Sequence, residues 1–194
     1  MTEEQAIRRG FVFNQLAGGD LEIVDYVGKS RRKDLVIPDT IGGRKVTRIA
    51  SRAFPAIQVY CLVLPRYLEY IGDHAFIESQ IKRLSAQDSI RLKRIGHHAF
   101  YNCGIKEPMT IPASVEFIGQ DAFADNPLTT VELMPRRITI QSNAFGWFNE
   151  DLTIYCVNDP AVHKELCGYK FVNTTMEQRY IRHRKAYSLL DVTV

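Results

Sequence analysis

Two histidines and an aspartate occupy matching places in the sequence. His74, His98 and Asp121 each stand directly before an Ala-Phe dipeptide. Imidazole and carboxylate groups are common ligands of zinc and other transition metals, so these three side chains have the composition of a metal site. A metal-dependent hydrolase is therefore one hypothesis for this chain.

The same position also holds Arg52 and Asn143, before the first and last Ala-Phe dipeptides. A column that accepts arginine and asparagine is typical of a solvent-facing corner that tolerates any polar side chain. We therefore expect no metal at His74, His98 and Asp121, and no cofactor elsewhere.

Motifs of known catalytic sites are missing from the sequence. There is no G-x-S-x-G nucleophile elbow, no H-E-x-x-H, no Walker loop and no G-x-G-x-x-G. The four cysteines form no C-x-x-C pair, which favours reduced thiols. Cys103 is predicted to be a packed thiol rather than a nucleophile. The sequence predicts a protein that is not an enzyme and has no catalytic residue.

The Ala-Phe dipeptide belongs to a long repeat. It occurs five times, at steps of 22, 24, 23 and 22 residues, and an isoleucine precedes each alanine by four positions: Ile49, Ile71, Ile95, Ile118 and Ile140. Neither a single helix nor a hairpin generates such a period. We expect a solenoid whose units, about 23 residues long, bury their apolar columns against their neighbours.

Each unit carries further signals of a coil. Apolar runs ending in proline, such as Leu62–Pro65, predict short strands, because proline cannot continue a hydrogen-bonded ladder. Glycine follows three of the isoleucines, and we expect it to supply a tight or left-handed backbone at a corner. The isoleucines, the phenylalanines of the dipeptides and a strand column with Ile37 and Leu64 are predicted to point inward.

The pattern I-P-x-x-V-x-x-I-G-x-x-A-F, best seen at residues 111–123, resembles the BspA-like (Treponema pallidum-type) leucine-rich repeats. The resemblance covers about residues 20–172. It implies a parallel-sheet solenoid and, for many members of the family, a bacterial surface or adhesive role.

The predicted fold is an α/β repeat protein dominated by short strands. We expect a right-handed leucine-rich-repeat solenoid with a parallel sheet, an N-terminal helix and hairpin cap, and a C-terminal helical cap. One domain spans 1–172, with the N-terminal cap at 1–34, about five repeats at 35–150 and the C-terminal cap at 151–172. Residues 173–194 form a basic, helical C-terminal extension.

Local signals support these caps. Thr2 and Gln5 form a capping-box pattern for a short helix that stops before Gly10. Residues 11–13 and 21–23 predict a hairpin over the first coil. Residues 152–155 predict the last strand, residues 159–168 a helix, and residues 176–190 the helix of the extension.

Another column stands directly before the isoleucines: Arg48, Tyr70, Arg94, Phe117 and Thr139. Because side chains alternate across a strand, a residue next to a buried isoleucine points outward. Arginine stacked on an aromatic ring is worth about 0.5–2 kcal/mol per pair, and both residue types are enriched at protein interfaces. Two interpretations stay open: a ladder that only stiffens the solenoid, or a surface that binds a partner.

The segment Val59–Leu64 is apolar at consecutive positions. A strand that exposes Cys61 and Val63 needs a cover. Candidates are the C-terminal segment, a second copy of the chain in a homo-oligomer, or a different partner. We place Tyr60 and Val63 at the margin of the candidate partner surface.

Basic residues gather in the first coil, and an acidic partner is a second possibility there. The candidates for this contact are Arg31, Arg32, Lys33, Arg44 and Lys45. Such a run is usually a solvated corner, and otherwise it draws an acidic protein, a nucleic acid or an anionic surface.

The leading hypothesis is a non-catalytic scaffold that presents one solenoid face to a protein partner. A polyanion-binding or nucleic-acid-binding module is the alternative. No run reaches the roughly 18 apolar residues of a membrane span, and the first residues are polar, unlike a secretory signal. We expect a cytoplasmic protein, or a surface or secreted one if an export signal has been removed.

Overall fold

A computed structural model describes residues 1–29, 33–86, 88–135, 137–146, 151–157 and 171–174 of the chain. The predicted helices at residues 159–168 and 176–190 lie outside these ranges. In chain order the elements are α1 (Glu3–Arg8), β1 (Phe11–Gln15), β2 (Leu21–Tyr26), β3 (Leu35–Val36), β4 (Thr40–Ile41), β5 (Arg44–Ile49), β6 (Gln58–Val63), β7 (Tyr70–Ile71), β8 (Gln80–Ser85), β9 (Arg94–Ile95), β10 (Met109–Ile111), β11 (Phe117–Ile118), β12 (Thr130–Leu133), β13 (Thr139–Ile140), β14 (Thr153–Val157) and β15 (Phe171–Thr174).

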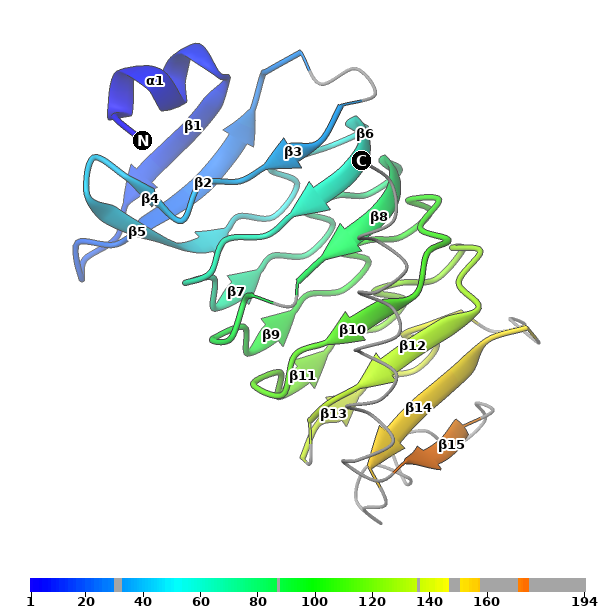
Figure 1. Ribbon diagram of the computed structural model, residues 1–194. Coiled ribbons are helices and arrows are strands. Elements are labelled where there is room, and N and C mark those ends of the chain that lie inside the picture. Colours follow the sequence, from blue (N-terminus) through cyan, green and yellow to red (C-terminus); the bar gives the residue numbers. More distant parts are fainter. Residues whose placement is uncertain (30–32, 87, 136, 147–150, 158–170, 175–194) are drawn as a thin grey trace, which may run out of the picture.

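The strands form two rows along a stack of coils (Figure 1). The first row is an eight-stranded sheet in the order β1-β2-β5-β7-β9-β11-β13, with β4 paired to β5. The second row consists of a three-stranded sheet, β3-β6-β8, and a four-stranded sheet, β10-β12-β14-β15. Pairing between successive coils is parallel throughout. The predicted parallel solenoid of short strands is confirmed.

The inward columns form one continuous core between the two rows. The five isoleucines of the repeat are at most 7% exposed, and the five phenylalanines of the dipeptides at most 1%. The phenylalanine rings stack face to face, with centroids 4.9, 4.9, 5.2 and 5.6 Å apart along the column. This spacing is close to the separation of paired strands, about 4.8 Å, so the backbone ladder and the ring stack share one period.

The corner before each Ala-Phe dipeptide has a left-handed backbone. The φ angles there are 59, 58, 52, 52 and 56° at Arg52, His74, His98, Asp121 and Asn143. Asparagine, aspartate and histidine are the non-glycine residues that adopt this conformation most readily. The backbone therefore favours the histidine, aspartate and asparagine residues that occupy four of these five positions. The corner is less permissive than a position open to any polar residue.

The glycines after the isoleucines have a different role from the predicted one. Gly72, Gly96 and Gly119 are absent from the glycines with positive φ. A Cβ atom built on Gly96 would lie 2.7 Å from the backbone nitrogen of Asp73, and one on Gly119 would lie 2.6 Å from that of His97. These glycines let adjacent coils approach closely, and the left-handed turn comes two residues later.

A buried polar column, which the sequence analysis missed, ties each coil to the previous one. Ser79 Oγ donates to the carbonyl of Phe54 at 3.1 Å, and Cys103 Sγ donates to that of Phe76 at 2.9 Å. In the next coil, Asn126 Nδ2 donates to the carbonyl of Phe100 at 2.7 Å. Every such residue stands three positions after a phenylalanine of the core column.

Asn126 makes the largest set of these bonds. Its Oδ1 also accepts from the backbone N–H groups of Cys103 and Ile105, at 3.1 and 2.9 Å. The residue is 6% exposed, so water does not replace these partners freely. One amide thus satisfies both donors and acceptors of a neighbouring coil.

The N-terminal cap agrees with its sequence signals. Thr2 Oγ1 accepts from the Gln5 backbone N–H at 3.2 Å, and Gln5 Oε1 accepts from the Thr2 N–H at 3.0 Å, which completes the capping box of α1. The hairpin of β1 and β2 is antiparallel, and β2 pairs in parallel with β5 of the first coil. Ala6 of α1 is fully buried in the core.

At the other end, the strand predicted at residues 152–155 is present as β14 (Thr153–Val157), but the prediction that it is the last strand is wrong. A further strand, β15, pairs in parallel with β14, with Ile154 opposite Phe171. The offset of this pair, 17 residues, is shorter than the repeat, which explains why a search for the repeat period misses it. The strand crosses the expected border between residues 172 and 173.

Replacing Asn126 by alanine should lower the free energy of unfolding by at least about 3 kcal/mol, because two buried N–H groups lose their acceptor. Thr129→Ala, at an exposed site, should stay within about 0.5 kcal/mol of the wild type. Urea titrations monitored by circular dichroism measure both values. Equal losses in the two variants would show that the buried amide is not needed.

Replacing Gly96 by alanine should cost about 1–3 kcal/mol, because its new methyl group overlaps the backbone of the preceding coil. The matched control is Gly18→Ala, whose Cβ meets no atom within 4 Å and whose φ is not positive. That variant should be neutral or slightly stabilising. Thermal melts of both variants distinguish close approach of coils from a general preference for glycine.

Candidate partner-binding site

The candidate residues before the isoleucines lie in one row on the eight-stranded sheet. Across the parallel pairs, Arg48 is opposite Tyr70, Tyr70 is opposite Arg94, and Arg94 is opposite Phe117. Thr139 follows Phe117 at the exposed end of the row. Strands β7, β9, β11 and β13 are two residues long and their second residue is a buried isoleucine. The first residue therefore supplies the outward side chain of each strand.

The side chains of this row, hereafter the ladder (Arg48, Tyr70, Arg94, Phe117), pair with one another. The Arg48 Cζ lies 4.8 Å from the Tyr70 ring centroid, and the Arg94 Cζ lies 3.8 Å from that of Phe117. These are cation–π distances. Stacking uses the flat face of a guanidinium and leaves its N–H edge available. Among the described residues, neither arginine has a hydrogen bond or an ion pair through its side chain.

An outer row of side chains, not recognised in the sequence analysis, runs beside the ladder on the same face. Tyr67 lies between two cations, with Lys45 Nζ 5.3 Å and Arg91 Cζ 5.7 Å from its ring centroid. Each member of this outer row (Lys45, Tyr67, Arg91) stands three residues before a ladder residue. The repeat alignment that revealed the ladder contains this row as well, at the same period.

The flanks of the ladder are mixed in charge. Glu69, Lys93 and Glu116 precede ladder residues directly and are partly or fully exposed. Glu22 of β2 is opposite Arg48 in the parallel register. The His97 ring meets Phe117 edge to face, with centroids 6.0 Å apart. The face is therefore aromatic and cationic along its axis and polar at its margins.

The placement of Tyr60 and Val63 at the margin of this surface is wrong. Both belong to β6, which lies in the three-stranded sheet of the second row, so they face away from the ladder. Tyr60 and Val63 are separated from the ladder because β6 and the ladder strand β7 belong to different rows of strands. Tyr60 is 49% exposed and Val63 is half-buried.

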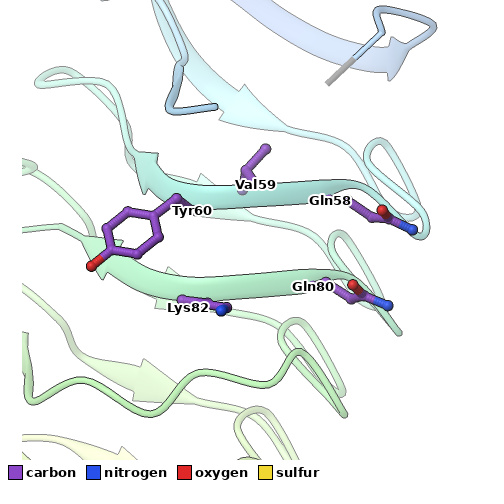
Figure 2. A pocket seen from close by; sticks show the side chains of 5 residues that line it. All are labelled: Gln58, Val59, Tyr60, Gln80 and Lys82. Carbon is purple, nitrogen blue, oxygen red and sulfur yellow. The ribbon is translucent and has the colours of Figure 1, made fainter. Parts of the chain in front are cut away.

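Tyr60 contributes to a separate site on the second row. Its hydroxyl donates to Glu107 Oε1 at 3.0 Å, and this bond raises the pKa of the Tyr60 phenol. A hollow of about 450 Å³ lies beside the ring, lined among the described residues by Gln58, Val59, Tyr60, Gln80 and Lys82 (Figure 2).

Cys61 is not exposed, contrary to the expectation for this strand. The side chains of Cys61 and Leu62 are both buried, at 8% and 0% exposure. Strict alternation breaks at this pair, because Val59 and Leu62 both enter the core with two residues between them. Burial raises the pKa of the Cys61 thiol.

The basic residues of the first coil do not form one described cluster. Arg31 and Arg32 lie outside the described residues, and Lys33 is exposed. Arg44 pairs with Glu3 of α1 at 3.6 Å. Lys45 joins the outer row beside the ladder. The structure thus divides this group between a cap contact and the candidate face.

The two histidines of the corner column do come together, as the spacing allowed. The His74 and His98 rings stack at 4.9 Å with an angle of 4° between their planes. His98 Nε2 lies 3.5 Å from Asp121 Oδ2. Because nitrogen lone pairs lie in the ring planes, the lone pairs of the two stacked rings lie in two nearly parallel planes and do not converge on one ion. The column is therefore poorly arranged to chelate a metal.

Cys103 is a packed thiol in the structure. Burial raises its pKa to about 12, and its Sγ is bonded to the Phe76 carbonyl. A thiol with this pKa is protonated at neutral pH and is a poor nucleophile.

Comparison with known families decides the assignment of the chain. Residues 32–177 match six copies of the BspA type leucine rich repeat region. The chain belongs to the BspA-type leucine-rich repeat family. Its repeat is therefore one unit of a scaffold in which each coil packs on its neighbours.

One solved structure agrees with this BspA-type assignment. A leucine-rich repeat protein of T. pallidum is similar to the chain, with 26% identity, a TM-score of 0.66, and coverage of 85% of this chain and 80% of that one. A leucine-rich cell surface protein of Faecalibacterium prausnitzii has 20% identity and a TM-score of 0.44, and the match covers 86% of this chain and 54% of that one. No curated protein gives a significant match.

In the part of the chain that the structure describes, no helix combines the length and the hydropathy that a transmembrane segment requires.

The stability of this repeat protein should fall below about pH 6.5, the usual pKa of histidine. Burial, together with the positive charges of His98, Arg52 and His97, lowers the pKa of His74, while Asp73 opposes this shift. The unfolded chain therefore binds a proton at this site more strongly than the folded one. The contribution is fully present above the unfolded pKa and is lost as the pH falls through it toward the folded pKa.

The control is His74→Asn, since asparagine occupies the equivalent corner at Asn143 and adopts a left-handed backbone there. Urea midpoints at about pH 7.5 and 5.5 should differ less in this variant than in the wild type. An identical drop in both proteins would assign the pH dependence to other groups.

Proposed function

We propose that this BspA-type protein is a non-catalytic scaffold whose ladder face binds a protein partner. The observation that carries the proposal is the in-register alternation of arginine and aromatic residues on the exposed side of the eight-stranded sheet. Arginine and tyrosine are enriched among residues that dominate binding energy at interfaces. Stacking holds these side chains in one geometry before a partner arrives, which reduces the entropy lost on binding.

The size of the face fits this role. Three strand spacings separate Arg48 from Phe117, which gives a row of about 15 Å. A typical interface buries about 800 Å² on each partner. The outer row and the charged flanks widen the ladder and supply the polar rim that such an interface needs. Thr47, by contrast, is 5% exposed and contributes nothing to the rim.

A cytoplasmic location is part of the proposal. Cys61 and Cys103 are free and buried thiols. Reduced cysteines are usual in compartments where thiol-disulfide systems keep proteins reduced.

The test begins with a photo-crosslinking amino acid at Thr139, at the exposed end of the ladder row. A protein captured there should be absent when the same group replaces Lys106, which is exposed on the side of the second row. The captured protein is then purified for titration calorimetry.

Tyr70→Ala or Arg94→Ala should weaken its binding by about 2 kcal/mol or more, the range of interface hot spots. The melting temperature should change little, because both side chains lie outside the core. Lys106→Ala serves as the control and should bind normally. Normal binding by both ladder variants would make the ladder a structural stiffener and overturn the proposal.

A further inference from the structure

We infer that the partner segment on the ladder face is an acidic polypeptide, whose carboxylates bind the free edges of Arg48 and Arg94 and the two cations of the outer row. This inference rests on the proposed function and adds the chemistry of the partner.

Three cations outside the ladder face are paired with carboxylates of the chain. Arg8 pairs with Glu4 at 2.6 Å, Arg44 with Glu3 at 3.6 Å, and Arg83 with Glu107 at 3.9 Å. On the ladder face, Lys45, Arg48, Arg91 and Arg94 have no ion pair with any described residue, although Glu69 and Glu116 stand next to ladder residues. Their contacts are instead with aromatic rings.

An aromatic ring attracts a cation without neutralising it. The positive charge of each stacked guanidinium remains, and its N–H groups stay available in the plane of the group. A carboxylate bound edge-on to arginine can form two parallel hydrogen bonds, which is the strongest common arrangement for this pair. The face therefore offers binding sites for carboxylates that the chain itself does not fill.

The spacing of the cations calls for several carboxylates on one chain. Arg48 and Arg94 are two strands apart in the ladder, and Lys45 and Arg91 are two coils apart in the outer row, so each pair is separated by about 10 Å. A single small anion cannot bridge this distance. A polypeptide with acidic side chains at intervals can reach all four cations and lay its apolar groups on the edges of the rings.

The rings themselves argue against a nucleic acid. Single-stranded nucleic acids gain affinity by stacking bases on open aromatic faces. Phe117 is covered by Arg94 at 3.8 Å, Tyr70 by Arg48 at 4.8 Å, and Tyr67 by two cations. A base would have to displace a cation from its ring, whereas a carboxylate binds without disturbing the stack.

The probe is a fluorescein-labelled peptide of alternating glutamate and glycine, about 12 residues long and so about 40 Å when extended. Its partner probe carries glutamine in place of glutamate. Fluorescence anisotropy with the full chain, at about 50 mM NaCl, should show binding of the glutamate peptide alone. Raising the salt to about 300 mM should weaken binding, because the exposed charges are screened.

The double variant Arg48→Gln/Arg94→Gln should lose at least about tenfold in affinity for the glutamate peptide, as expected when charge-assisted bonds are removed. Lys106→Gln removes one positive charge outside the face and should change the affinity by less than about twofold. Circular dichroism checks that both variants are folded.

Equal binding of the two peptides, or equal losses in the double variant and Lys106→Gln, would overturn the inference. Tighter binding of an oligothymidine of similar length, with the same sensitivity to the double variant, would overturn it in favour of a nucleic-acid partner. Loss of the peptide result with intact crosslinking at Thr139 would remove the acidic specificity alone. Loss of both would remove the proposed function as well.

Discussion

The shared period of backbone and side chains is the constraint on which the molecule depends. Parallel strands require a separation of about 4.8 Å, and the core phenylalanines stack at 4.9 to 5.6 Å. Any change that separates two coils breaks the strand pairing and the ring stack together. Glycine after Ile71, Ile95 and Ile118 is needed for the same reason, since a Cβ atom there would meet the backbone of the preceding coil. The outward ladder inherits this spacing, so the order of the core also sets the geometry of the surface.

Repetition explains why so much could be predicted from the sequence. Each coil has an isoleucine equivalent to Ile118 and a phenylalanine equivalent to Phe123, so the burial of these two columns follows from the period. The outward direction of Phe117 follows from the burial of Ile118 next to it. Features that a period does not encode were missed or misjudged. To place Tyr60 relative to the ladder, one must know which row of strands β6 joins. Strand β15 pairs at an offset shorter than the repeat. Cys61 is buried because its strand does not alternate strictly.

The roles of residues in the repeat were harder to predict than their positions. The glycine at Gly96 was recognised, but its reason is contact with the previous coil and not a left-handed φ. The left-handed residue is His98, whose side chain type fits that backbone. Asn126 lies at the same place in its unit as Ser79 and Cys103, which hides a common bonding function behind three different side chains. Hydrogen bonding to a neighbouring coil leaves no single residue type in the sequence.

The buried polar column gives the stack a direction. Ser79, Cys103 and Asn126 each donate to a carbonyl of the coil that precedes them in the chain. Each coil is thus completed by the one synthesised after it. On the ribosome, the N-terminal cap and the first coils emerge first and can serve as a template for the next. Growth would proceed one coil at a time toward the C-terminus, and the newest coil would always be the one whose carbonyl still lacks its donor.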